Sequence, residues 1–333
     1  MAIHIPVIDI SSPSQEVAKR LLDAACTHGF VYIANSDNAA QIPPKDVESM
    51  FDLSKTFFKS PDPVKAECPY QTDKNQGWVG MQREMLDPKT QKRGDFKEAF
   101  NVGEYTNGKA SQPLPSPFRS HEAQLGRFFD QCHALCNSIL QLLAAALEIP
   151  SDEGGESWFA ERHDRNKGPS GSILRLLYYP ALPPIETTDI RAGAHSDYGS
   201  ITLLFQQPNG QPGLEILPRT GVWTPVPVNP ANASAPPILV NIGDLLSYWT
   251  DGLLKSTVHR VVFPPELVEG KGQDRYSMAF FCHPVDDAKL VPIPSPIIRN
   301  QVRGGDDGVS ERTQVLTAKD HLLERLAATY GAK

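Results

Sequence analysis

Two histidines and one aspartate stand where they could hold a single metal ion. His195 and Asp197 are two residues apart at the end of an expected strand, so their side chains leave the same face. His259 lies on a later expected strand between apolar neighbours. Two imidazoles and one carboxylate form the facial ligand set of non-haem Fe(II), which leaves positions open for a cosubstrate and O2. A His-x-Asp pair alone recurs by chance, but the three residues together favour an iron site.

Two further expected strands carry cations on the side that should face the barrel interior. Strand alternation puts Arg275, Ser277 and Phe281 on one face. A guanidinium inside a barrel is costly without an anion, and a hydroxyl two residues along could share that anion. A dicarboxylate would satisfy both, whereas a structural ion pair is the alternative for Arg275. The same parity places Arg175 and Tyr179 on the inner face, where Tyr179 could contact the cosubstrate.

Four residues are candidates for binding a substrate. Arg175 is either a substrate contact or half of an internal salt bridge. Tyr198 and Phe281 are the aromatic residues nearest the expected metal in sequence and parity, so they could enclose a flat or apolar molecule, with core packing as the alternative. Asn35 could donate a hydrogen bond from the N-terminal region, or it could cap a turn.

Periodicity divides the chain into a helical first part and a strand-rich second part. Apolar residues at helical spacing predict helices over Gln15–His28, Lys45–Lys59, Ser120–Leu147 and Leu316–Tyr330, and a short strand over Phe30–Ala34. The N-terminal half is therefore expected to be rich in helix. Gly-rich Arg303–Gly308 is expected to be a loop.

Short runs rich in β-branched and aromatic residues, separated by Gly, Pro, Asn and Asp, predict eight strands after residue 171. They are Ser172–Tyr179, Arg191–His195, Ile201–Gln206, Leu214–Leu217, Trp223–Val226, Ile238–Ile242, Thr257–Phe263 and Tyr276–His283. This pattern indicates an α+β chain with a mainly β core, a sandwich or jelly roll with flanking helices. We expect an N-terminal α/β region over 1–120, a backing helix over 121–150, the jelly-roll core over 170–285 and a helical cover over 286–333.

Composition narrows the class of partner. The 333 residues include 32 basic and 39 acidic side chains, and no basic stretch that would bind nucleic acid or anionic lipid. No apolar run reaches the roughly 18 residues needed to cross a bilayer. Five cysteines in so long a chain do not make a disulfide framework and fit a reducing compartment, with Cys132 and Cys136 expected to be buried thiols. The first residues lack a secretion signal, so we expect a cytoplasmic protein.

The sequence resembles the iron(II)- and 2-oxoglutarate-dependent dioxygenases, in the branch that includes isopenicillin N synthase. The resemblance covers nearly the whole chain. Matching segments follow in order: Ile5–Asp9, Gly29–Asn35, Leu176–Pro180, Ala194–Gly199, Pro212–Glu215, Asn241–Asp244, Ser256–Val261 and Arg275–Ser277. Together these motifs are far more specific than any one of them.

The resemblance implies a double-stranded β-helix with iron held by His195, Asp197 and His259. It also implies that Arg275 and Ser277 bind the distal carboxylate of 2-oxoglutarate with help from the Tyr179 hydroxyl. The implied activity is hydroxylation of a small molecule by O2 with release of succinate and CO2, helped in vitro by ascorbate. No obligate protein partner is implied.

The chain departs from the family pattern in two places, and two alternative functions are compatible with its residues. Plant members often carry Asn where this chain has Leu177, which removes one polar contact to the cosubstrate. The 264–274 segment is longer than usual and is either a surface excursion or part of an entrance. An iron oxidase that needs no 2-oxoglutarate remains an alternative, as does a non-catalytic jelly-roll binding protein. A nucleobase such as a pyrimidine, an amino acid or a specialised metabolite would each suit as substrate.

Overall fold

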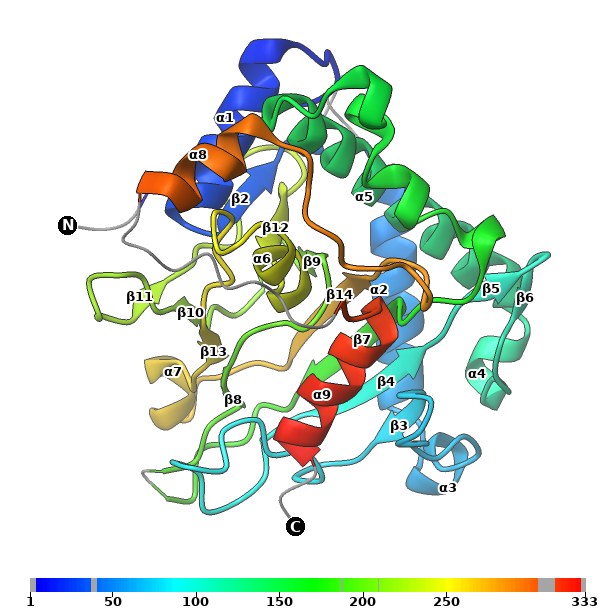
Figure 1. The fold of residues 1–333 in the computed structure, drawn as a ribbon. Helices are drawn as coiled ribbons and strands as arrows, with labels where there is room; N and C mark the ends of the chain where they lie inside the picture. The colour runs from blue at the N-terminus through cyan, green and yellow to red at the C-terminus, as the bar shows by residue number, and fades with distance from the viewer. Residues whose placement is uncertain (1–3, 37–40, 187, 209, 305–314, 331–333) are drawn as a thin grey trace.

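The computed structural model describes residues 4–36, 41–186, 188–208, 210–304 and 315–330. Its centre is a sandwich of two β-sheets (Figure 1). Two buried apolar clusters support this arrangement, one between the larger sheet and the helices and one between the two sheets. The architecture confirms the mainly β jelly roll with flanking helices.

The larger sheet contains eight strands and is antiparallel except at one edge, where its first two strands run parallel. In spatial order these are β1 (Val7–Ile8), β2 (Phe30–Ile33), β12 (Ile238–Ile242), β9 (Ile201–Gln206), β14 (Arg275–Cys282), β7 (Ile173–Tyr179), β4 (Glu98–Val102) and β3 (Gly77–Val79). The N-terminal region thus extends the sheet at both edges. Only β2 among its strands was predicted, because the charged and amide residues around β4 hide its buried pattern.

The smaller sheet contains β11 (Thr224–Pro225), β10 (Leu214–Ile216), β13 (His259–Val261) and β8 (Ala192–His195) in that order. Strands β13 and β8 are antiparallel, and their register sets His259 directly opposite His195. Residues opposite each other in an antiparallel pair project to the same face. The pairing of two short strands therefore brings together two imidazoles that are 64 positions apart in the chain.

Helices cover the outer face of the larger sheet, on the side away from the smaller sheet (Figure 1). The long helix α5 (Glu122–Ala146) and helix α2 (Pro44–Phe58) contact β14, and α1 (Gln15–Thr27) packs along α5. Helix α1 begins where the Ser14 hydroxyl accepts a hydrogen bond from the Val17 amide at 3.2 Å. It ends at Thr27, and the chain turns at Gly29, whose left-handed φ of 69° and closeness to the Lys255 carbonyl leave no room for a side chain.

The remaining α-helices of the described residues are short or lie near the C-terminus. They are α3 (Asp62–Lys65), α4 (Ser116–Arg119), α6 (Asp244–Trp249), α7 (Pro265–Val268), α8 (Pro296–Gly304) and α9 (Ala318–Tyr330), with a two-stranded hairpin of β5 (Tyr105–Thr106) and β6 (Lys109–Ala110). All four predicted helices and all eight predicted strands of the second part are present, with ends shifted by up to two residues.

Two segments singled out in the sequence lie towards the end of the chain, at 264–274 and at 303–308. The 264–274 segment contains α7 and lines no part of the central cavity described below, which favours the surface excursion over the entrance. In the Gly-rich stretch, residues 303 and 304 end α8, and 305–308 lie outside the described residues. Within the described residues, no helix is long and apolar enough to span a membrane.

Candidate active site

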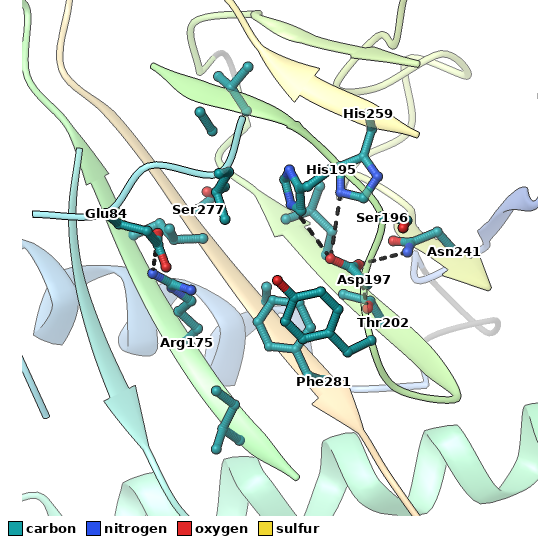
Figure 2. Close-up of a pocket in the computed structure, with 18 of the residues that line it drawn as sticks. Glu84, Arg175, His195, Ser196, Asp197, Thr202, Asn241, His259, Ser277 and Phe281 are labelled. Atoms are coloured by element: carbon teal, nitrogen blue, oxygen red, sulfur yellow. Dashed lines mark hydrogen bonds and ion pairs between the residues drawn. The ribbon is translucent and has the colours of Figure 1, made fainter. Parts of the chain in front are cut away.

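The sandwich encloses a cavity between its two sheets, and the three expected metal ligands meet in its wall (Figure 2). His195 ends β8, Asp197 follows two residues later, and His259 opens β13. The His195 Nε2 and His259 Nε2 atoms lie 3.7 and 3.6 Å from Asp197 Oδ1. One ligand atom from each residue falls within 4.8 Å of the others, and no second such group of histidine, cysteine or acidic residues occurs in the described part of the chain.

Hydrogen bonds to the protein fix which atom of each ligand faces the metal position. His195 Nδ1 lies 2.8 Å from the Gly193 carbonyl, and His259 Nδ1 lies 3.1 Å from the Thr257 carbonyl. These contacts make Nδ1 the protonated nitrogen and leave Nε2 as the metal ligand in both rings. Asp197 Oδ2 accepts hydrogen bonds from Thr202 Oγ1 and Asn241 Nδ2, both at 2.7 Å, so Oδ1 remains for the metal.

The protonation states also suit a cation. The pKa of His195 is lowered to about 4, mainly by burial. The neighbouring His259 also lowers this pKa, and its effect is larger than the opposite effect of Asp197. Burial alone would raise the pKa of Asp197, but His259, His195 and the donors Thr202 and Asn241 outweigh burial and keep it below its usual value. At neutral pH His195 is therefore neutral and Asp197 ionised, which are the forms that bind a divalent metal. The donor set fits Fe(II) in the open facial arrangement.

Arg275 lies further along the cavity wall on β14, directly opposite Tyr179 of β7. Its guanidinium donates to Ser277 Oγ and to Gln206 Oε1, both at 3.2 Å, and lies 4.8 Å from the centre of the Tyr179 ring. Burial lowers the pKa of Arg275, and the Tyr179 hydroxyl partly offsets this. Among the described residues Arg275 forms no ion pair with a carboxylate, which argues against a purely structural pair and for an anion from outside the chain.

The other end of the cavity carries buried charges from the N-terminal region. Glu84 Oε2 lies 2.7 Å from Arg175 Nη2 and 2.8 Å from Lys97 Nζ (Figure 2 shows the Glu84 to Arg175 pair). Lys97 also pairs with the buried Asp95. Arg175 therefore forms the internal salt bridge considered from the sequence and also lines the cavity.

Asp95 links this charge cluster to the metal position. Its Oδ1 accepts the Gly193 amide at 3.0 Å, and the carbonyl of the same Gly193 accepts His195 Nδ1. A side chain at Gly193 would place its Cβ 2.2 Å from Gln91 Oε1, so only glycine permits this close approach.

Nine of the ten residues singled out in the sequence lie around this cavity. They are His195, Asp197, His259, Arg275, Ser277, Tyr179, Arg175, Tyr198 and Phe281. Asn35, the tenth, is buried and lies outside the cavity, so the expected substrate contact is not supported. Its Oδ1 accepts the Gln41 and Ile42 amides, and its Nδ2 donates to the Ile42 carbonyl, so capping is its role.

Sequence reasoning missed several lining residues. Thr202 and Asn241 are polar groups at inward positions of otherwise apolar strands, and this pattern is a signal that could have found them. Gln206 is inward by the same count and accepts a hydrogen bond from Arg275, although it does not line the cavity itself. Glu84 comes from a loop with no periodicity, and no local signal points to it.

Comparisons with known proteins agree with this geometry. Residues 5–121 match the family model described as non-haem dioxygenase in morphine synthesis N-terminal, and residues 170–284 match the 2OG-Fe(II) oxygenase superfamily. The chain is 31% identical to proline hydroxylase buaE of Petromyces alliaceus, over 95% of this chain and 94% of that protein. It is 27% identical to 2-oxoglutarate-dependent dioxygenase htyE of Aspergillus rugulosus, over 93% and 92%.

Solved structures with the same fold include a full-length protein of Neurospora crassa in complex with alpha-KG and thymine. That structure has a TM-score of 0.77 and 31% sequence identity to this chain, and the alignment covers 98% of this chain and 97% of the Neurospora chain. The likeness therefore extends over the N-terminal region as well as the β core.

Proposed function

Because the chain belongs to the 2-oxoglutarate- and Fe(II)-dependent oxygenase superfamily, we propose that it hydroxylates a C–H bond of a small-molecule metabolite and releases succinate and CO2. It is an oxidoreductase that uses Fe(II) and 2-oxoglutarate. The observation that carries the proposal is the pairing, in one cavity, of an open three-ligand metal position with the buried Arg275, which has only neutral partners among the described residues. A binding protein has no use for an open metal.

Each side chain in the cavity receives a role in this proposal. His195, Asp197 and His259 hold Fe(II), and the metal supplies the activation of O2 when it is bound. Arg275 and Ser277 hold the distal carboxylate of 2-oxoglutarate, and the Tyr179 hydroxyl assists. The cavity walls exclude water from the reacting groups. Leu177, opposite Ser277 in the register, contributes only apolar surface there.

The charges at the other end of the cavity favour an uncharged polar substrate. Burial would lower the pKa of Lys97, but Asp95 and Glu84 outweigh it and raise that pKa, so Lys97 stays positive. Among the ion pairs of the described residues, Lys97 and Arg175 then balance Glu84 and Asp95, which favours an uncharged substrate group over a carboxylate at this end. Arg175 as a hydrogen-bond donor and Glu84 as an acceptor line the same cavity as the aromatic rings of Tyr198 and Phe281. This combination suits a small planar ring with amide groups. We therefore propose a pyrimidine base or a similar cyclic amide, a class that includes the thymine bound by the Neurospora crassa protein.

The test is succinate release by anaerobically purified protein supplied with Fe(II), ascorbate, 2-oxoglutarate and air. Pyrimidines, amino acids and aromatic metabolites form the substrate panel. We expect a pyrimidine to increase succinate release, and we expect the hydroxylated product to form in an amount equal to the succinate. His195→Ala should abolish both, whereas His121→Ala, an exposed histidine outside the cavity, should change neither.

Two results would redirect the proposal. Stimulation by a free amino acid and not by any pyrimidine would reject the cyclic amide while leaving the reaction class in place. Consumption of O2 with a substrate but without succinate would instead support the oxidase that needs no 2-oxoglutarate. All five cysteines are free thiols, which supports the cytoplasmic location that we also propose.

A further inference from the structure

Arg191 is a buried cation with too few partners for its charge. It directly precedes β8, four residues before His195, and its side chain is 0% exposed. Its Nη2 donates to the Pro180 carbonyl at 3.0 Å, whereas Nε and Nη1 have no hydrogen-bond partner among the described residues. No carboxylate in that part of the chain forms an ion pair with it. Buried charges are normally paired, so this arrangement costs stability and calls for a functional reason.

The neighbours of Arg191 connect it to the proposed cosubstrate site. Its Cζ lies 5.8 Å from the centre of the Tyr179 ring, and the Cζ of Arg275 lies 4.8 Å from the same centre. Phe263 contributes a second ring, 5.6 Å away. Burial and the positive Arg275 lower the pKa of Arg191 to about 10, although Tyr179 and the more distant carboxylate of Asp274, which forms no ion pair with Arg191, act in the opposite direction, so Arg191 remains charged at neutral pH. The guanidinium groups of Arg191 and Arg275 thus both lie near the ring of Tyr179. Of these three residues, Arg275 and Tyr179 line the cavity and Arg191 does not.

We propose that Arg191 is a positioning and specificity residue, which holds the Tyr179 ring and supplies a second positive charge that makes the site select a dianionic 2-oxo acid. This inference rests on the proposed contact of Arg275 and Tyr179 with the distal carboxylate. In the empty site the positive charges of Arg191 and Arg275 repel each other. Binding of the distal carboxylate relieves this repulsion, so the repulsion in the empty site increases the affinity for the charged ligand. A 2-oxo acid whose far end is uncharged does not relieve the repulsion, so its affinity does not depend on the Arg191 charge.

A purely structural role fits the observations less well. An apolar side chain of similar volume would contact Tyr179 and Phe263 without burying a charge, and such replacements are often neutral or stabilising in protein interiors. Apart from the hydrogen bond to Pro180, the Nε and Nη1 atoms of Arg191 have no acceptor in the described part of the chain. The positive charge itself is therefore the property to test.

The experiment measures binding and not turnover. Zn(II)-loaded protein is titrated calorimetrically, without O2, with 2-oxoglutarate and with 2-oxopentanoate, which has the same chain but lacks the distal carboxylate. Arg191→Gln removes the charge and keeps a donor for the Pro180 carbonyl, and Arg191→Lys keeps the charge. Arg162→Gln is the matched control, because Arg162 lies 3.8 Å from the Trp158 ring and donates to the Trp158 carbonyl at 2.7 Å outside the cavity.

We expect Arg191→Gln to weaken 2-oxoglutarate binding about tenfold or more, which corresponds to about 1.4 kcal/mol, and to leave the Kd of 2-oxopentanoate within about twofold. Arg191→Lys should retain most of the affinity for 2-oxoglutarate, and Arg162→Gln should match the unsubstituted protein. Equal weakening of both ligands would assign Arg191 a structural role and overturn the inference. Unchanged 2-oxoglutarate binding in Arg191→Gln would overturn it as well.

Folding and the underlying proposal are checked separately. Circular dichroism establishes that each variant is folded, and Arg191→Met replaces Arg191→Gln if the amide is not tolerated. If the unsubstituted protein binds neither 2-oxo acid, the proposed function fails. If it binds 2-oxoglutarate and only the Arg191 variants behave unexpectedly, the further inference fails alone.

Discussion

Thr202 and Asn241 are cross-strand partners that both donate to one oxygen of Asp197. Thr202 lies on β9 and Asn241 on β12, directly opposite each other in the antiparallel register. Both donors reach Asp197 Oδ2 at 2.7 Å (Figure 2 shows the bond from Asn241). The larger sheet thus orients the carboxylate, while the smaller sheet supplies the two imidazoles. The metal position depends on the packing of both sheets, since neither contains all of its parts.

Thr202→Val should weaken metal binding without unfolding the protein. The substitution keeps the shape of the side chain and removes one of the two donors that fix Asp197. Loss of such an outer hydrogen bond typically costs 10- to 100-fold in metal affinity, so we expect a Kd for Fe(II) or Mn(II) about tenfold higher. Anaerobic titration of the metal-free protein measures this.

Thr250→Val is the control for that substitution, because Thr250 is equally buried but donates to the Leu246 carbonyl in α6 and does not line the cavity. It should leave the metal Kd unchanged. Equal metal affinity in Thr202→Val and the unsubstituted protein would mean that Asn241 alone holds Asp197 in place.

Glu84→Gln should shift the substrate preference toward anions. Glu84 Oε2 contacts both Arg175 and Lys97, so its neutralisation leaves one uncompensated positive charge in the cavity wall. We expect binding of a pyrimidine with a ring carboxylate to strengthen relative to the unsubstituted pyrimidine. We also expect a loss of roughly 3 kcal/mol in the free energy of unfolding, because a buried ion pair loses one partner. Competition binding and denaturant unfolding measure the two effects.

Glu215→Gln provides the comparison for Glu84→Gln. Glu215 pairs with Arg260 at 2.8 Å in the smaller sheet, outside the cavity. This variant should lower stability less, since its pair is partly exposed, and should leave substrate preference as it was. A shift in preference of the same size in both variants would rule out a local effect of Glu84.

How far the sequence determines this site depends on the element that carries each residue. Alternation along β7 and β14 placed Arg175, Tyr179, Arg275 and Ser277 on the inner face, because a strand buried on both sides still has a strict period of two. The same logic fails for Glu84, whose loop has no period and reaches the cavity only through long-range packing.

Asn35 illustrates the opposite error. It was expected to contact a substrate from the N-terminal region or to cap a turn, and it forms three local hydrogen bonds, two accepted by Oδ1 and one donated by Nδ2. Of the two roles considered for Asn35, these local hydrogen bonds favour capping over substrate contact. Cavity residues contributed by α9 were equally beyond prediction, because the sequence indicates a covering helix without saying which face it covers.

His163 should make the protein less stable at acidic pH. It is fully buried, with Nδ1 2.7 Å from the Phe159 carbonyl and Nε2 2.8 Å from Ser200 Oγ, and burial lowers its pKa to about 4. In the unfolded chain its pKa is about 6.5. Between these values the unfolded state binds a proton that the folded state does not, so stability is fully present above about pH 6.5 and falls as pH drops toward 4.

His163→Gln should remove this contribution. Denaturant unfolding from pH 4.5 to 7.5 is expected to give a steeper loss in the unsubstituted protein, by up to one proton or about 1.4 kcal/mol per pH unit. His321, whose pKa burial also lowers to about 4, remains in both proteins and cancels in the comparison. Parallel pH profiles for the two proteins would contradict the prediction, whatever their difference in absolute stability.

Leu322→Ala should uncouple the oxidation of 2-oxoglutarate from the oxidation of substrate. Leu322 and Leu326 of α9 line the cavity, and Arg325 between them pairs with Asp244 at 2.5 Å. Asp244 in turn accepts a hydrogen bond from Ser196, which lies between two metal ligands. Truncating Leu322 opens this wall to water while the ion pair keeps the helix in place, so succinate should exceed hydroxylated product where the unsubstituted enzyme gives equal amounts.

Leu323→Ala separates this effect from a general weakening of the helix. Leu323 is the next residue of α9, 51% exposed, and does not line the cavity. Both substitutions remove the same atoms from the same helix, but only Leu322 separates the cavity from solvent. Quantifying succinate and product in one reaction should therefore give a ratio near one for Leu323→Ala and a clearly higher ratio for Leu322→Ala. Equal ratios in the two variants would mean that α9 covers the cavity without sealing it.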